Sequence, residues 1–284
     1  MPASRASINI SDPAFLHGAA VFTTMLARNK VVFRFDQHLE RLSENVRFLG
    51  LDTEVSTGAL VSDTYTTIEA NGLSDARCRI TLSPGPPDGR PLVLITADPL
   101  PEYPEWWYSN GISTVVTSLK QSREDPIAGR KTSCYLPRIL AMREAAAKKA
   151  DEAVWYTTDN HLAEACFSNI FLWLDGKVKT PPKDTPVLPG ITRQAVLELC
   201  DELDIPSDEE SRLTVDDMLA AEEVFLTNST MGIRPVARIE RHEVGNGKPG
   251  ETTKKLADAL VKLIRKECSR DRSDTGTEPR TKGK

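Results

Sequence analysis

The spacing of apolar positions divides the first third of the chain into short strands and one amphipathic helix. VFTTMLARNKVVFRF predicts two strands joined by a turn at residues 28–30. Four apolar residues then recur at spacings of three and four, which predicts a helix between Asp36 and Gly50. These residues are Leu39, Leu42, Val46 and Leu49. CRITLSP and PLVLITADPL predict a hairpin, and GISTVVTSLK predicts a further strand.

The remaining two thirds of the chain mix both periodicities. A helix is predicted after Tyr135, because Pro137 suits a first helical turn, where its missing N–H is not needed. EAVWYT, HLAEAC and SNIFLWL predict three strands, and EEVFLTNSTMGIRPV predicts a strand and a polar turn. PVLPGITRQAVLELCDEL and TKKLADALVKLIRK predict two more helices. No segment repeats at a fixed period.

Length and composition bound the organisation of the chain. At 284 residues with 39% hydrophobic residues, the chain has enough apolar residues for a core and is expected to form two lobes. We predict a smaller N-terminal domain at 1–120, a linker at 121–129 and a larger domain at 130–268. Residues 269–284 offer almost nothing apolar to bury, which predicts disorder.

Composition also excludes several classes of protein. No run approaches the roughly 18 apolar residues of a membrane-spanning helix, and MPASRASINI lacks the apolar core of a signal peptide. We therefore expect a cytoplasmic protein without membrane contact. The odd number of cysteines, five without CxxC spacing, argues against a disulfide framework and a zinc site. Four scattered histidines and a net charge of −5 argue against metal and nucleic-acid binding.

The stretch GRKTSCYL places Lys131 just before a predicted helix. A phosphate-binding P-loop is excluded, because that motif needs glycine where this chain has Arg130 and Glu124. A lone lysine is most often a solvated surface charge. A lysine that reacts as an amine needs its pKa lowered by burial or by cationic neighbours.

Three other stretches are suited to binding an anion. LPGIT places two backbone amides, those of Ile191 and Thr192, at a helix start, where N–H groups lack partners. LTNSTMG is a hydroxyl-rich turn, and Arg41 lies off the apolar stripe of its helix. Taken singly, each is more often a helix cap, a turn or a solvated arginine.

Taken together and in this order, these stretches resemble the class IV, or fold-type IV, enzymes that use pyridoxal 5'-phosphate (PLP). This family includes branched-chain aminotransferases, D-amino-acid aminotransferases and aminodeoxychorismate lyases. The matching stretches are SDPAFLHGAAVF, DQHLERL, KTSCYLPRILA, DEAVWYTTDNHLAEACFSNIF, GKVKTPP, VLPGITRQAVLEL and EVFLTNSTMGIRPV. The resemblance implies an α+β fold with a smaller α/β N-terminal domain and a larger β-barrel-like C-terminal domain with flanking helices. It also implies an active site between the domains and a homodimer.

The resemblance assigns roles around the reacting part of the cofactor. Lys131 matches the lysine that forms a Schiff base with PLP, and its released amine would then carry the proton of the substrate Cα. Glu164 matches the glutamate that pairs with the pyridine nitrogen. Tyr135 matches a tyrosine near the phenolic oxygen of the cofactor. Without such a role, Glu164 would be a surface residue at a strand end, and Tyr135 would be part of the core.

The resemblance also assigns a phosphate site. Arg41 matches the phosphate arginine, Ile191 and Thr192 would donate their amides, and Thr230 its hydroxyl.

Several departures from the family pattern fall where substrates bind. Many family aminotransferases read Y-G-D-G-V-F-E where this chain has HGAAVFT at 17–23. Cys134 replaces the usual asparagine, and Ala163-Glu164-Ala165-Cys166 replaces T-E-G-S. These changes leave the cofactor assignment intact and weaken any assignment of the substrate.

Two reactions and one non-catalytic role remain open. We favour an aminotransferase that moves an amino group between a branched-chain-like or other small amino acid and a 2-oxo acid. Phe22, Thr24 and NSTMGIRPV resemble the lyases, which release pyruvate from aminodeoxychorismate to form 4-aminobenzoate. The third alternative is a binding protein with the same fold.

A substrate carboxylate would need a cationic partner. The candidates are Arg77, Arg79 and Arg90, each of which could equally form a structural ion pair. No histidine stands two residues after Arg90, which weakens the D-amino-acid alternative.

Overall fold

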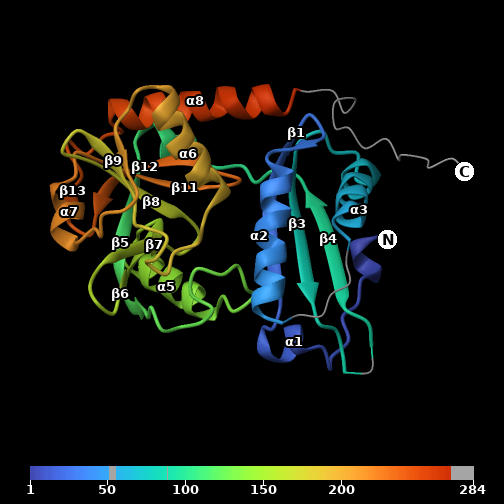
Figure 1. The fold of residues 1–284 in the computed structure, drawn as a ribbon. Coiled ribbons are helices and arrows are strands. Elements are labelled where there is room, and N and C mark those ends of the chain that lie inside the picture. The colour runs from blue at the N-terminus through green and yellow to red at the C-terminus, as the bar shows by residue number, and fades with distance from the viewer. Residues whose placement is uncertain (51–55, 88, 270–284) are drawn as a thin grey trace, which may run out of the picture.

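The computed structural model describes residues 1–50, 56–87 and 89–269, and contains a smaller and a larger β-sheet side by side (Figure 1). The smaller sheet has the order β2-β1-β3-β4 and is antiparallel throughout. Its strands are β1 (Val21–Arg28), β2 (Val31–Val32), β3 (Ala76–Ser83) and β4 (Leu92–Asp98). Its helices are α2 (Phe35–Phe48) and α3 (Thr57–Ala70). The short helices η1 (Ala3–Arg5) and α1 (Pro13–His17) precede the sheet.

The two faces of the smaller sheet have different chemistry because side chains alternate along each strand. One face carries Met25 and Ile80, which pack with Leu42 of α2 and Leu60 of α3 in a common core. The opposite face carries Phe22 and Thr24 of β1 and, in register with Thr24, Arg79 of β3. One face of the sheet is therefore a core, and the other is available to form a site.

Among the described residues, the larger sheet has nine strands in the order β10-β9-β8-β11-β12-β5-β6-β7, with β13 paired to β12, and it curls into a half-barrel (Figure 1). Its first five strands are β5 (Ile112–Gln121), β6 (Glu152–Thr157), β7 (Leu162–Ala165), β8 (Asn169–Leu174) and β9 (Lys177–Lys179). The others are β10 (Ser207–Asp208), β11 (Glu223–Asn228), β12 (Gly232–Ile239) and β13 (His242–Glu243). The flanking helices are α4 (Trp106–Ser109), α5 (Leu136–Ala147), α6 (Ile191–Glu202), α7 (Val215–Ala220) and α8 (Glu251–Glu267). The predicted α+β class is confirmed.

The pairing of strand β5 bears on the predicted domain boundary, which stays a prediction. We assigned residues 1–120 to the first domain, yet β5 runs parallel to both β6 and β12 within the larger sheet. This pairing joins strands far apart in sequence, so local periodicity could not reveal it. We propose that the boundary falls between β4 and β5, within residues 99–111.

The segment around Lys131 links the two sheets. The backbone N–H of Phe22 donates to the Lys131 carbonyl oxygen at 2.9 Å, and Thr132 forms a β-bridge with Val21. The start of β1 is therefore held against the segment that leads into α5.

Two predictions concern features that the structure covers only in part. The predicted disordered tail at 269–284 lies outside the described residues except for Ser269. Within the described part of the chain, no helix is long and apolar enough to cross a membrane.

Candidate active site

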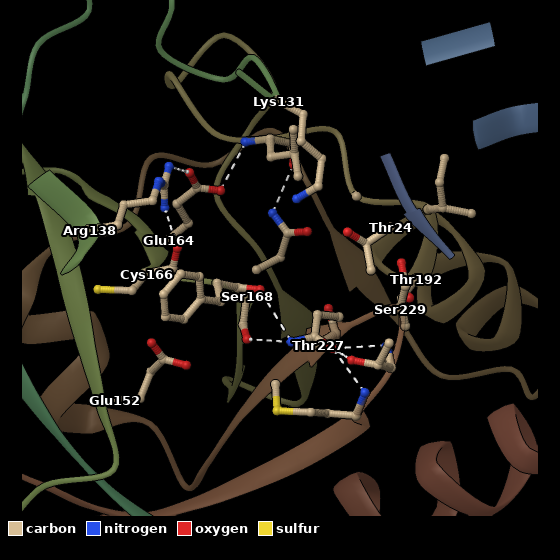
Figure 2. A pocket seen from close by; sticks show the side chains of 18 of the residues that line it. Thr24, Lys131, Arg138, Glu152, Glu164, Cys166, Ser168, Thr192, Thr227 and Ser229 are labelled. Atoms are coloured by element: carbon tan, nitrogen blue, oxygen red, sulfur yellow. Dashed lines mark hydrogen bonds and ion pairs between the residues drawn. The ribbon is translucent and has the colours of Figure 1, made fainter. Parts of the chain in front are cut away.

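A cavity of about 610 Å³ is lined by residues from both sheets. Ten residues predicted for the site line it: Phe22, Thr24, Arg41, Arg79, Lys131, Tyr135, Glu164, Ile191, Thr192 and Thr230. Figure 2 shows the Lys131 side chain reaching into this cavity, with Glu164 to one side and Thr192 to the other. Segments separated by up to about 200 positions in sequence (22 to 230) therefore meet at one place.

Lys131 supplies an amine with unusual acidity. Its Nζ lies 3.4 Å from the Tyr135 hydroxyl oxygen. Burial, helped by the charges of Arg41 and Arg138 and opposed by Glu164, lowers the pKa of Lys131 to about 7. A substantial fraction of this amine is therefore unprotonated at neutral pH, which is the form that attacks a carbonyl carbon.

Arg41 and the start of α6 form one wall of the cavity. The Arg41 Nη1 donates to the Pro189 carbonyl oxygen at 3.0 Å, and burial lowers the pKa of Arg41 to about 10, so the guanidinium stays charged at neutral pH. No side chain caps α6 at Gly190. A Cβ on Gly190 would collide with Asn169 Oδ1, so only glycine lets the chain approach this closely. The wall combines a cation with unpaired helical N–H groups, which suits an anion.

Hydroxyl groups from the β11–β12 turn extend this wall. Asn228 Oδ1 accepts from the backbone N–H groups of Thr230 at 3.0 Å and Met231 at 2.9 Å, which fixes the turn. The Thr230 hydroxyl lies 2.9 Å from the Tyr103 hydroxyl. The buried Thr227 Oγ1 has no hydrogen-bond partner among the described residues. A polar ligand at this wall would satisfy it.

Glu164 lies on β7 and is held at both oxygens. Its Oε2 accepts from the Leu188 backbone N–H at 2.9 Å, and its Oε1 pairs with Arg138 Nη2 at 2.5 Å. Sequence reasoning missed Arg138. A signal was present, because Arg138 follows Tyr135 by three positions in the first turn of α5, and positions three apart lie on one helical face.

Aromatic rings form a column along the cavity. The Phe22 and Tyr135 ring centroids are 5.3 Å apart, and Tyr135 stacks on Phe167 at 5.9 Å with an interplanar angle of 13°. The Arg79 guanidinium lies 3.5 Å from the Phe22 ring centroid. Sequence reasoning did not select Phe167. The column offers an apolar wall beside a cation.

The three arginines considered for a substrate carboxylate differ in position. Arg77 lines the cavity but pairs with Asp98 at 3.2 Å. Arg79 lines it and has no carboxylate within 4.0 Å among the described residues. Arg90 is exposed in the connection between β3 and β4 and does not line the cavity. Arg90 lies in the hairpin connection beyond the ends of these strands, so its predicted contact with substrate has no support from this cavity and stays a prediction.

A second ion pair, also missed from the sequence, lines the same cavity. Arg234 Nη2 of β12 and Glu152 Oε2 of β6 are 2.8 Å apart, with side chains 2% and 3% exposed. Burial raises the pKa of Glu152, and the charge of Arg234 opposes this rise. The two side chains therefore contribute a buried ion pair to the cavity lining.

Comparison with known proteins identifies the family. Residues 20–239 match the family model described as "Amino-transferase class IV". The chain belongs to the class IV aminotransferase family. A putative branched-chain-amino-acid aminotransferase of Methanocaldococcus jannaschii is 30% identical to it over 262 residues, which cover 89% of this chain and 90% of that protein.

Solved structures agree with this assignment. A branched-chain amino acid aminotransferase of Escherichia coli matches with a TM-score of 0.89 at 27% identity, covering 96% of this class IV aminotransferase and 94% of that chain. A putative 4-amino-4-deoxychorismate lyase of Legionella pneumophila matches with a TM-score of 0.81 at 26% identity, covering 93% and 97%. The predicted fold-type IV architecture is confirmed, and the chain is an enzyme of an aminotransferase family.

Proposed function

We propose that this class IV aminotransferase binds PLP and moves an amino group between an amino acid and a 2-oxo acid. The observation that carries the proposal is the Lys131 amine, whose pKa is lowered to about 7 inside the cavity. The residues present fit a phosphorylated cofactor. The uncapped start of α6, the charged Arg41 and the unpartnered Thr227 hydroxyl all lie at one wall.

Each residue has a distinct part in this chemistry. When bound, PLP supplies an electron sink that stabilises negative charge at the substrate Cα. The Lys131 Nζ would hold the cofactor covalently, and once released it would carry the proton from the substrate Cα to the cofactor C4'. Glu164 holds a proton on the pyridine nitrogen. Tyr135 lies next to the amine and orients it through its hydroxyl.

The cofactor phosphate is bound by a separate set of groups. These are the Arg41 guanidinium, the backbone N–H groups of Ile191 and Thr192, and the Thr230 hydroxyl. The Thr230 hydroxyl oxygen lies 2.9 Å from the Tyr103 hydroxyl and 3.3 Å from Asn228 Oδ1, so its position is held before any ligand binds.

We assign the substrate carboxylate to Arg79. This arginine faces the cavity from β3 without a carboxylate partner among the described residues, and it lies beside Phe22 and Thr24. The neighbouring aromatic column suits an apolar side chain, which supports a branched-chain-like or other small amino acid as donor.

Removing Lys131 tests the central assignment. Purified protein reduced with borohydride and then digested should carry a pyridoxyl group on the peptide that contains Lys131. Lys131→Ala should lose this adduct, whereas Lys148→Ala, which changes an exposed lysine, should keep it. A pyridoxyl group on another lysine would refute the assignment. Purified protein that binds no PLP at all would instead support the non-catalytic alternative.

An aminodeoxychorismate lyase is the second candidate. It is supported by the sequence at Phe22 and Thr24 and by the likeness to the Legionella pneumophila protein at 26% identity. An aminotransferase given its amino donor alone should convert the bound cofactor to the pyridoxamine form, and a 2-oxo acid should reverse this. A lyase should release pyruvate from aminodeoxychorismate without an acceptor. A panel of L- and D-amino acids that leaves the cofactor spectrum unchanged, together with pyruvate release, would favour the lyase.

The homodimer, the cytoplasmic location and the division into two domains remain predictions. Sedimentation of the purified chain tests the first.

A further inference from the structure

Arg138 is bound at three acceptors around the end of β7. Its Nη2 pairs with Glu164 Oε1 at 2.5 Å, and its Nη1 donates to the carbonyl oxygens of Ala165 at 3.1 Å and Cys166 at 2.8 Å. Figure 2 shows the guanidinium facing the Glu164 carboxylate. A planar guanidinium held at three points has little freedom to turn away.

The Glu164 carboxylate is almost fully enclosed. Its side chain is 3% exposed, and its second oxygen accepts from the Leu188 N–H at 2.9 Å. A buried carboxylate needs a compensating charge, and Arg138 is the cation in contact with it. Burial lowers the pKa of Arg138, but the charge and hydrogen bond of Glu164, together with Tyr135 and Cys166, raise it overall. Arg138 therefore remains charged.

The charge state that the proposed function requires of Glu164 disfavours the one that it requires of Lys131. The proposed function requires an ionised Glu164 and an uncharged Lys131 amine. A nearby negative charge favours the protonated form of an amine. The charged groups that act on the amine come from four elements: Arg41 of α2, Arg79 of β3, Arg138 of α5 and Glu164 of β7.

We propose that Arg138 is a positioning residue that fixes the Glu164 carboxylate at the cavity wall and offsets its negative charge, so that the Lys131 amine stays free to react. The inference rests on the proposed function for the use of the amine. The three contacts of Arg138, including its pairing with Glu164, do not depend on the proposed function. Consistent with this, Arg138 lowers the pKa of Lys131 while Glu164 raises it.

The test measures the Lys131 amine in the full chain without cofactor. Trace acetylation with acetic anhydride across pH, followed by mass spectrometry of the Lys131 peptide, gives the midpoint at which the amine becomes reactive. Arg138→Met should raise this midpoint by about one pH unit, because a positive charge that acts on the amine is removed. At a pH below the midpoint, one unit is a tenfold slower modification.

Further variants distinguish an effect of the Arg138 charge on the Lys131 midpoint from a general structural effect. Glu164→Gln should lower the midpoint, because Arg138 is then left without its counter-charge. The double variant should return it close to the wild-type value, since the pair is then uncharged on both sides. Arg138→Lys keeps the charge and should leave the midpoint near wild type. Arg143→Met, an exposed change on the same helix, is the matched control and should have no effect.

A purely structural role for Arg138 predicts a different pattern. The melting temperature would fall in Arg138→Met while the Lys131 midpoint stayed unchanged, and this result would overturn the proposal. If Arg138→Met does not fold, an unchanged midpoint in Glu164→Gln would overturn it equally. Because the measurement uses no cofactor, a failure here is distinguishable from a failure of the proposed reaction, which the borohydride mapping tests.

Discussion

The buried pair of Arg234 and Glu152 yields a quantitative prediction for stability. The two residues lie on β12 and β6, with β5 between them in the sheet, and neither side chain is more than 3% exposed. Glu152 Oε1 has no partner among the described residues, so the pairing with Arg234 is the main compensation for the buried carboxylate. Arg234→Met keeps most of the side-chain volume but removes the cation. The loss is expected to be about 3–5 kcal/mol in the free energy of unfolding.

The pH dependence of this loss has a definite sign. Burial raises the pKa of Glu152 and Arg234 opposes that rise, so the pKa should rise further in Arg234→Met. A carboxyl with a raised folded-state pKa binds a proton more tightly in the folded chain than in the unfolded chain. Its stability contribution is present below the unfolded value of about 4.3 and is lost as pH rises through the folded value. The free energy of unfolding of Arg234→Met should therefore fall further below that of the wild type at pH 8 than at pH 5.

Urea denaturation of the cofactor-free chain, followed by circular dichroism at both pH values, measures this difference. The m-value shows whether the same surface is exposed in each variant. Arg238→Met changes an exposed arginine on the same strand and should stay within about 0.5 kcal/mol of wild type. Combining Arg234→Met with Glu152→Met should recover much of the loss. This prediction would be refuted if Arg234→Met lowered the free energy of unfolding by less than about 1 kcal/mol at pH 8, or by the same amount at pH 5 as at pH 8. Either result would mean that the Glu152 charge does not depend on Arg234 for compensation.

Three further predictions concern the cavity wall and the substrate. Arg41→Ala should weaken PLP binding by about 1.5–3 kcal/mol, roughly 10- to 150-fold in the Kd measured by equilibrium dialysis, whereas Arg47→Ala on the exposed side of α2 should not. Gly190→Ala puts a methyl group against the Asn169 side-chain oxygen, so PLP affinity and melting temperature should both fall. Gly58→Ala, in helix α3 where space is open, should leave PLP affinity unchanged and should not lower the melting temperature. Arg79→Met should raise the KM of the amino acid at least about tenfold without loss of the covalent cofactor, because it removes a charged contact to the substrate alone. An unchanged KM would move the carboxylate site elsewhere.

Local pattern was enough to predict the elements with strong periodicity. The helix that carries Arg41 was predicted at 36–50 and lies at Phe35–Phe48, because its buried residues recur at helical spacing. The helix α3 was missed, since Leu60, Thr64 and Ile68 are its only buried residues and threonine is not an apolar signal. Motif order selected eleven residues for the site, and ten of them line the cavity.

The partners of those residues depended on the folded chain. Arg138 and Glu164 are 26 positions apart, and Arg234 and Glu152 are 82 apart, so no helical or strand period relates them. Their pairing follows from how α5, β6, β7 and β12 pack around the curled sheet. The same holds for β5, whose parallel pairing with β6 and β12 places it in the larger sheet, and for Arg90, which does not line the cavity. The sequence by itself determined the local elements and the chemical types at the site, whereas the charge pairs and the sheet order arise from long-range contacts that only tertiary packing creates.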